Sequence, residues 1–83
     1  MTLLYFAWVR QKVGKSEEVF KLPPGIVDGN ALVAHLKTLG ANYADAFADP
    51  ARIRVAVNHH HTSFDARIAD SDEVAFFPPV TGG

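Results

Sequence analysis

The pattern of apolar and polar residues predicts two strands at the start of the chain. Residues 3–9 form a continuous apolar run with aromatic and β-branched members, which predicts a central strand buried on both faces. Residues 10–16 form a polar turn in which Gly14 is available for positive φ. Residues 17–22 then predict a second strand, so the chain begins with a hairpin that ends at the Pro-Pro-Gly loop of residues 23–25.

One main helix is predicted after this hairpin. Its apolar positions at helical spacing are Leu32, Leu36 and Leu39. Asp28 can cap the N-terminus of this helix, and Gly40 can end it in the C′ position. Gly29 near the start weakens the prediction, because glycine inside a helix costs about 1 kcal/mol relative to alanine.

The second half of the chain predicts shorter elements. Residues 42–49 predict a short helical turn, residues 52–57 a half-buried strand, residues 59–64 a short strand or hairpin arm, and residues 72–77 the last strand. This order is an α+β pattern in which one main helix covers one face of one mixed sheet. We therefore predict a single β-grasp (ubiquitin-like) domain over residues 1–83, with four to five strands and the first and last strands central and parallel.

One face of the predicted sheet carries no helix. Strand alternation turns a set of apolar or small side chains toward this open face: Leu4, Phe6, Trp8, Ala56, Ala75 and Phe77. Because solvated sheet faces are normally polar, this set predicts a protein interface in which Phe6, Trp8 and Phe77 are the anchors. The alternatives are that the parity of one strand is wrong, or that the first strand is buried on both sides.

Composition excludes several functional classes. The chain has no cysteine, which excludes a disulfide framework, a thiolate metal site and a cysteine nucleophile. Its net charge of −1, with acids and bases mixed, gives no indication of a nucleic acid or an anionic membrane as partner. No apolar run approaches the ~20 residues that span a bilayer, and the N-terminus lacks the features of a signal peptide, so we expect a cytoplasmic protein.

The chain ends in a segment that contains two prolines and two glycines. Proline has no backbone N–H, so Pro78-Pro79 is expected to end strand pairing and to send residues 78–83 off the sheet as an extended tail. This tail can place the carboxylate of Gly83 roughly 20 Å from the domain. Gly82 and Gly83 carry no side chain and can thread a narrow channel. The alternative is a frayed terminus without a role.

Three segments together resemble a known family. They are residues 6–10 (Phe-Ala-Trp-Val-Arg), residues 55–58 (Val-Ala-Val-Asn) and residues 72–83, which end in Phe-Phe-Pro-Pro-Val-Thr-Gly-Gly. The resemblance is to the small subunits of molybdopterin synthase, which are ubiquitin-like sulfur carriers. It spans essentially the whole chain, and the terminal segment is its most specific part. The chain departs from the family at Ser71, where glycine is usual.

The resemblance implies a sulfur-transfer chemistry in molybdenum cofactor biosynthesis. A ubiquitin-activating-type enzyme uses ATP to adenylate the C-terminal carboxylate, and a sulfur donor protein converts the adenylate to a thiocarboxylate. The large subunit of molybdopterin synthase then receives the tail, in a complex of two small and two large subunits. There the sulfur passes to cyclic pyranopterin monophosphate. The resemblance implies that the small subunit is not catalytic alone and holds no permanent cofactor.

The resemblance also assigns residues to these roles. Gly83 carries the adenylate and the thiocarboxylate, and Gly82 precedes it without a side chain that could block a narrow channel. The expected partner-binding residues are Phe6, Trp8, Arg10, Ala75, Phe77, Pro78, Pro79, Val80 and Thr81. Three alternatives stay open: a related carrier for thiamine or tRNA thiolation, a modifier conjugated to other proteins, and a plain binding module with an inert tail.

A run of three histidines, His59, His60 and His61, is the remaining candidate for chemistry. His59 and His61 share one strand face, and imidazole is a ligand for zinc and copper. Two such ligands without cysteine or a nearby acidic pair make a poor closed site. We therefore expect an exposed hairpin and no metal, and the sequence assigns the run no role.

Overall fold

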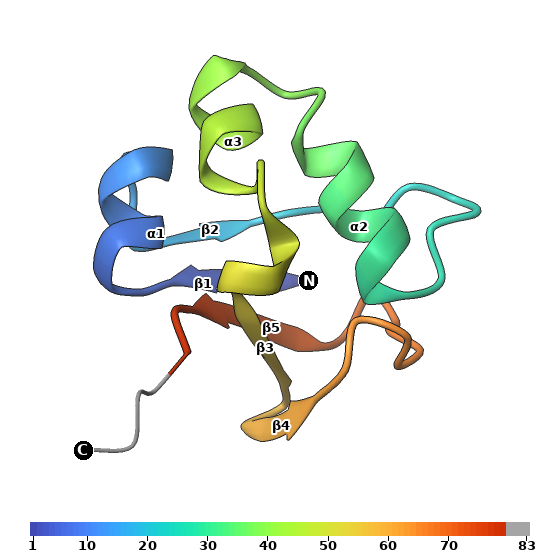
Figure 1. The fold of residues 1–83 in the computed structure, drawn as a ribbon. Helices are drawn as coiled ribbons and strands as arrows, with labels where there is room; N and C mark the ends of the chain where they lie inside the picture. The colour runs from blue at the N-terminus through green and yellow to red at the C-terminus, as the bar shows by residue number, and fades with distance from the viewer. Residues whose placement is uncertain (80–83) are drawn as a thin grey trace.

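The structure, a computed structural model, describes residues 1–79 and places five strands of that part in one mixed sheet (Figure 1). The strands are β1 (Thr2–Tyr5), β2 (Glu17–Val19), β3 (Arg54–Val57), β4 (His60–Thr62) and β5 (Glu73–Phe77). Their order is β2-β1-β5-β3-β4, with β1 and β5 parallel and the other neighbours antiparallel. This arrangement is the β-grasp fold, and the predicted pairing of the first and last strands is confirmed.

The helices pack on one face of this sheet (Figure 1). They are α1 (Ala7–Val13), α2 (Gly29–Leu36) and α3 (Ala41–Ala46), and a 3₁₀ turn at Pro50–Arg52 leads into β3. Burial alternates along β1 and β5, so one side of each strand enters the core and the other side stays accessible. The core that results is aromatic at its centre, where the rings of Phe47 and Phe76 meet edge to face at 4.9 Å.

The prediction of a strand over residues 3–9 is confirmed for residues 3–5 and wrong beyond them, because β1 ends at Tyr5 and the chain then turns into α1. Ala7, the first helical residue, has a φ of 52°, in the left-handed region that allows a sharp turn from strand to helix. Val9 and Val13 lie four residues apart on α1 and are both buried in the core. Instead of a polar turn, residues 10–16 therefore contain the end of a helix, which Gly14 closes with a φ of 93°.

The predicted central helix is confirmed, with a different end. The Asp28 side chain accepts a hydrogen bond of 2.8 Å from the Ala31 N–H and caps α2. Packing explains the glycine at position 29, because a Cβ added to Gly29 would lie 2.9 Å from the carbonyl oxygen of Phe64. The helix ends at Leu36, and Gly40 precedes α3 instead of following α2. Within residues 1–79, every helix is too short or too polar to cross a membrane.

Candidate functional site

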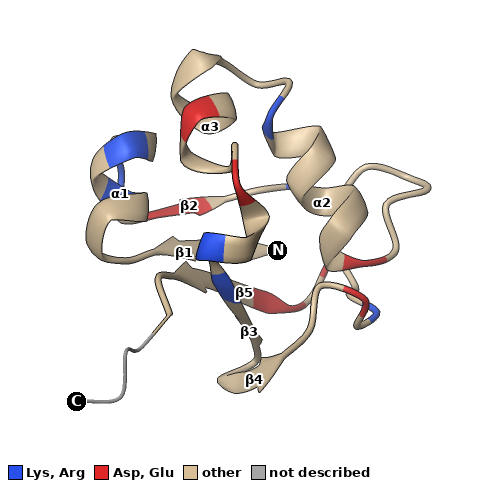
Figure 2. Cartoon of the chain, in the orientation of Figure 1, with Lys and Arg blue, Asp and Glu red and all other residues tan. Residues whose placement is uncertain are grey.

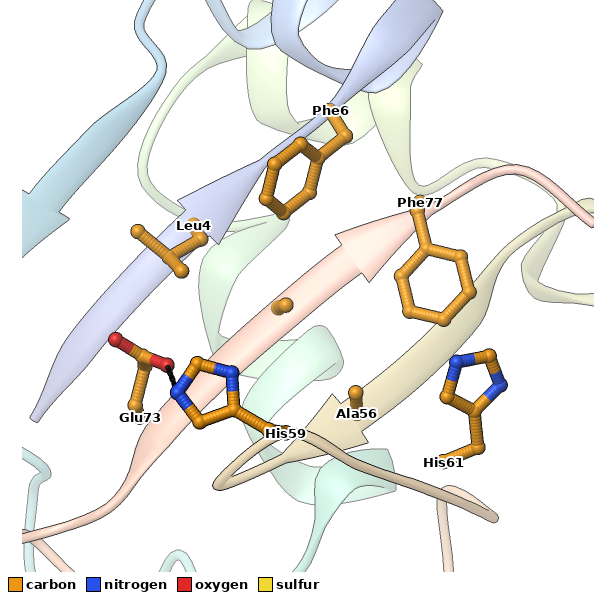
Figure 3. Close-up of a pocket in the computed structure, with 8 residues that line it drawn as sticks. Leu4, Phe6, Ala56, His59, His61, Glu73 and Phe77 are labelled. Carbon is orange, nitrogen blue, oxygen red and sulfur yellow. Dashed lines mark ion pairs between the residues drawn. The ribbon is translucent and has the colours of Figure 1, made fainter.

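The open face of the sheet contains a shallow hollow of about 250 Å³ (Figure 3). Its lining consists of Leu4, Phe6, Ala56, His59, His61, Glu73, Ala75 and Phe77. Strand register builds its floor, because Ala75 pairs with Leu4 on one side and with Ala56 on the other. The volume is below the roughly 300–1,000 Å³ of typical small-molecule pockets, so the hollow fits a side chain of a protein partner better than a cofactor.

Two phenylalanines form the rim of this hollow. Phe6 follows β1 directly, and 48% of its surface is exposed. Phe77 is the last residue of β5 and is half-buried. Figure 2 shows that β1 and β4 carry no charged residue and that most charges lie on helices and loops. The floor of the hollow, formed by Leu4, Ala56 and Ala75, is apolar, as the alternation of the sequence predicts.

Five of the six side chains expected on the open face line the hollow, and Trp8 does not. Trp8 lies on α1, packs against the core, and has the guanidinium carbon of Arg52 at 5.7 Å from its ring centre. Its predicted place on the sheet face is wrong, because it rests on a strand that the chain does not form. Arg10 belongs to the same helix and is exposed there.

The exit of the tail adjoins the hollow. Strand pairing ends at Phe77, which pairs with Arg54 of β3, and Pro78 and Pro79 follow outside any strand and are half-buried. The predicted end of pairing at the prolines is confirmed. The other residues predicted for the tail lie outside the described part of the chain: Val80, Thr81, Gly82 and Gly83.

The histidine run forms a tight hairpin at the edge of the hollow. Asn58 and His59 have φ of 51° and 69° and connect Val57 to its partner His60, which makes a two-residue loop of type I′. The Asn58 side chain fixes the loop, because its amide donates to Asp72 Oδ1 and accepts from the Glu73 N–H, both at 3.0 Å.

Two of the three histidines face the hollow. His59 Nε2 lies 2.9 Å from Glu73 Oε2, and the ring of His61 lies 5.0 Å from the ring of Phe77 (Figure 3). Sequence reasoning missed the places of His59, His61 and Glu73 in this surface. Alternation along β5 carries the signal for Glu73, which shares a face with Ala75. Within residues 1–79, no three His, Cys, Asp or Glu side chains are grouped to hold a metal ion.

A second polar group lies on the other side of the sheet and is structural. The hydroxyl groups of Tyr5 and Tyr43 both donate to Glu18 Oε2 at 2.8 Å. Burial, and then the hydrogen bond to the Glu18 carboxylate, raises the pKa of each tyrosine above its ordinary value. Both hydroxyls therefore stay protonated at neutral pH and serve to join β1 and α3 to β2.

The chain is similar to known proteins in both sequence and fold. The sequence pattern of the ThiS family matches residues 3–83. The molybdopterin synthase sulfur carrier subunit of Escherichia coli is 43% identical, with 98% of this chain and 96% of the relative covered. The subunit of the same name in Haemophilus influenzae is 31% identical, with coverages of 100% and 99%. A solved structure from Pyrococcus furiosus, a putative molybdopterin converting factor subunit 1, has a TM-score of 0.75 at 31% identity and 95% coverage of both chains.

Proposed function

Since the chain belongs to the ThiS family, we propose that it acts as the sulfur carrier subunit of a molybdopterin synthase. The observation that carries this proposal is the 43% identity, over nearly the full length, to a relative of that name. The apolar hollow beside the tail exit supports the proposal, because a carrier has to dock on another protein while its terminus enters the partner's site.

The reactive group in this proposal is the carboxylate of Gly83. A C-terminal carboxylate has a pKa of about 3.3–3.7, so it is ionised at neutral pH and is a poor electrophile. An activating enzyme of the ubiquitin-activating type overcomes this by joining the carboxylate to the α-phosphate of ATP, which releases pyrophosphate. A sulfur donor protein then supplies the sulfur that replaces AMP, and the terminus becomes a thiocarboxylate.

The large subunit of the synthase is the proposed acceptor of the loaded tail. Its active site would bind cyclic pyranopterin monophosphate and take the sulfur from Gly83, in a complex of two small and two large subunits. Gly82 would let the tail pass through a narrow channel, because it has no side chain. This chain would supply the sulfur and the docking surface, and the large subunit would supply the acids and bases of the reaction.

The described part of the chain supports the docking step. Phe6 and Phe77 present apolar surface to a partner. Burying such a side chain fully contributes about 1.5–3 kcal/mol of favourable free energy. The tail leaves from β5, which is held between β1 and β3 in the middle of the sheet. A partner that covers the hollow therefore receives the tail from a fixed position. Val80 and Thr81 would line the entry of the channel in this proposal.

Intact-mass spectrometry tests the proposed function. The full chain is incubated with its activating enzyme, ATP and a sulfur source, and a mass gain equal to the exchange of one oxygen for one sulfur is expected. A variant that lacks Gly83 is the control and should show no gain. An unchanged mass for the full chain would favour the binding module with an inert tail. Loading without pterin product in the presence of the large subunit would favour a carrier for another pathway.

A further inference from the structure

The hollow contains one polar side chain whose hydrogen-bonding capacity the described chain does not use, the imidazole of His61. His61 pairs with Ala56 in the sheet, is exposed, and packs its ring 5.0 Å from the ring of Phe77. Within residues 1–79 its side chain forms no hydrogen bond and no ion pair. His59 differs, because its Nε2 is already 2.9 Å from Glu73 Oε2.

The residues that line the hollow leave His61 without a carboxylate partner. Glu73 of β5 is the only carboxylate among the described lining residues, and it faces His59 (Figure 3). On β3, Arg54 lies outside the lining of the hollow, and its guanidinium donates to the carbonyl oxygens of Ala51 and Ile53. His60, next to His61 on β4, points to the other face because side chains alternate along a strand.

A partner that covers the hollow removes water from His61. A buried N–H that loses water and finds no acceptor weakens binding, and a hydrogen bond between an imidazolium and a carboxylate is among the stronger kinds. We propose that the surface covering this hollow belongs to an acidic and apolar segment of a partner protein. Its apolar side chain lies over Ala56 and Ala75, and its carboxylate accepts a hydrogen bond from His61. This inference rests on the proposed function, because it takes the large subunit as that partner.

The dissociation constant of the full chain for the large subunit from the same organism tests this inference. It is measured from about pH 6 to about pH 8, the range in which imidazole changes charge. We expect the unaltered chain to bind about tenfold more tightly at the acidic end. His61→Leu should bind about tenfold more weakly than the unaltered chain at the acidic end, with a flatter pH profile. His61→Gln should also be flat, because glutamine keeps a donor and carries no charge.

Two further variants control for the other imidazoles. His60→Leu changes the same strand on its opposite face and should keep the affinity and pH profile of the unaltered chain. His59→Gln should keep the part of the profile that His61→Leu removes. If His61→Leu binds more tightly, or keeps the full pH profile, the partner has an apolar or neutral group there and the inference is wrong. That outcome leaves the proposed function standing, whereas absence of binding by the unaltered chain at every pH overturns both.

Discussion

Glu18 connects three elements of the fold through one carboxylate. Its Oε2 accepts hydrogen bonds from Tyr5 of β1 and Tyr43 of α3, and its Oε1 lies 3.5 Å from Lys15 Nζ. Tyr5 is almost fully buried, so its hydroxyl has little access to water as a substitute acceptor. Glu17, the neighbour on the same short strand, is exposed and lies on the opposite face. The two glutamates therefore allow a matched comparison.

Glu18→Ala should lower the free energy of unfolding by about 2–3 kcal/mol, because two tyrosine hydroxyls lose a charged acceptor. Glu17→Ala should change it by less than about 0.5 kcal/mol, as is usual for exposed positions. Urea denaturation of both variants measures the difference. Equal effects of the two substitutions would show that the carboxylate of Glu18 does not hold β1 and α3 together.

Ala7 carries the backbone strain at the junction of β1 and α1. A left-handed φ costs an L-residue about 1–2 kcal/mol, and glycine avoids most of this cost. Ala7→Gly should therefore raise the free energy of unfolding by up to about 1 kcal/mol, despite the greater freedom of glycine in the unfolded chain. Ala34→Gly, at an exposed position inside α2, should lower it by about 1 kcal/mol. Denaturation midpoints that fall by the same amount in both variants would contradict this account.

Among the helices and strands, the sequence predicts correctly the ones that a local residue pattern indicates. The capped helix α2 and the alternating strands β3 and β5 follow from Asp28 and from hydrophobic spacing. Helix α1 was missed because an unbroken apolar run fits a strand and a buried helix equally well. The turn at Asn58 was missed for another reason: a type I′ hairpin is usually indicated by Asn-Gly, and here the second position is His59.

The junction of β1, β2 and α3 should weaken in alkali. The pKa of Tyr5 is raised above its unfolded value of about 10, first by burial and then by Glu18. Folding therefore gains stability from the protonated hydroxyl below that pH. This gain is lost as the pH rises, because the unfolded chain ionises while the folded chain does not. The free energy of unfolding should fall above about pH 10, and less steeply in Tyr5→Phe; identical slopes would rule out Tyr5 as the cause.

At the scale of the whole molecule, the open face could be predicted only in part. Leu4, Ala75 and Phe77 follow from alternation along single strands. His61 and His59 enter the hollow through the register between β3 and β4 and through the turn that joins them, which local patterns do not fix. The parallel contact of β1 with β5 brings the two ends of the sequence together, and it is this contact that places the docking surface beside the tail.

Substitutions at Phe6 and Leu39 test whether the partner docks on the open face. They have nearly equal exposure, 48% and 46%, but only Phe6 lines the hollow. Phe6→Asp should weaken binding of the large subunit about thirtyfold or more, as expected for an aromatic anchor. It should leave folding intact, because Phe6 is the N-cap of α1 and aspartate is favoured there. Leu39→Asp should bind normally. Titration calorimetry that finds equal losses would place the docking surface elsewhere.

Sulfur transfer in a single turnover shows whether this chain delivers sulfur to the pterin. The chain is loaded with sulfur, freed of the activating enzyme, and mixed with the large subunit and cyclic pyranopterin monophosphate. Mass spectrometry then follows the chain and the pterin together. We expect the chain to return to its original mass as sulfur appears in the pterin. A chain that keeps its sulfur while the pterin stays unchanged would contradict the claim that this protein is the sulfur carrier of molybdopterin synthase.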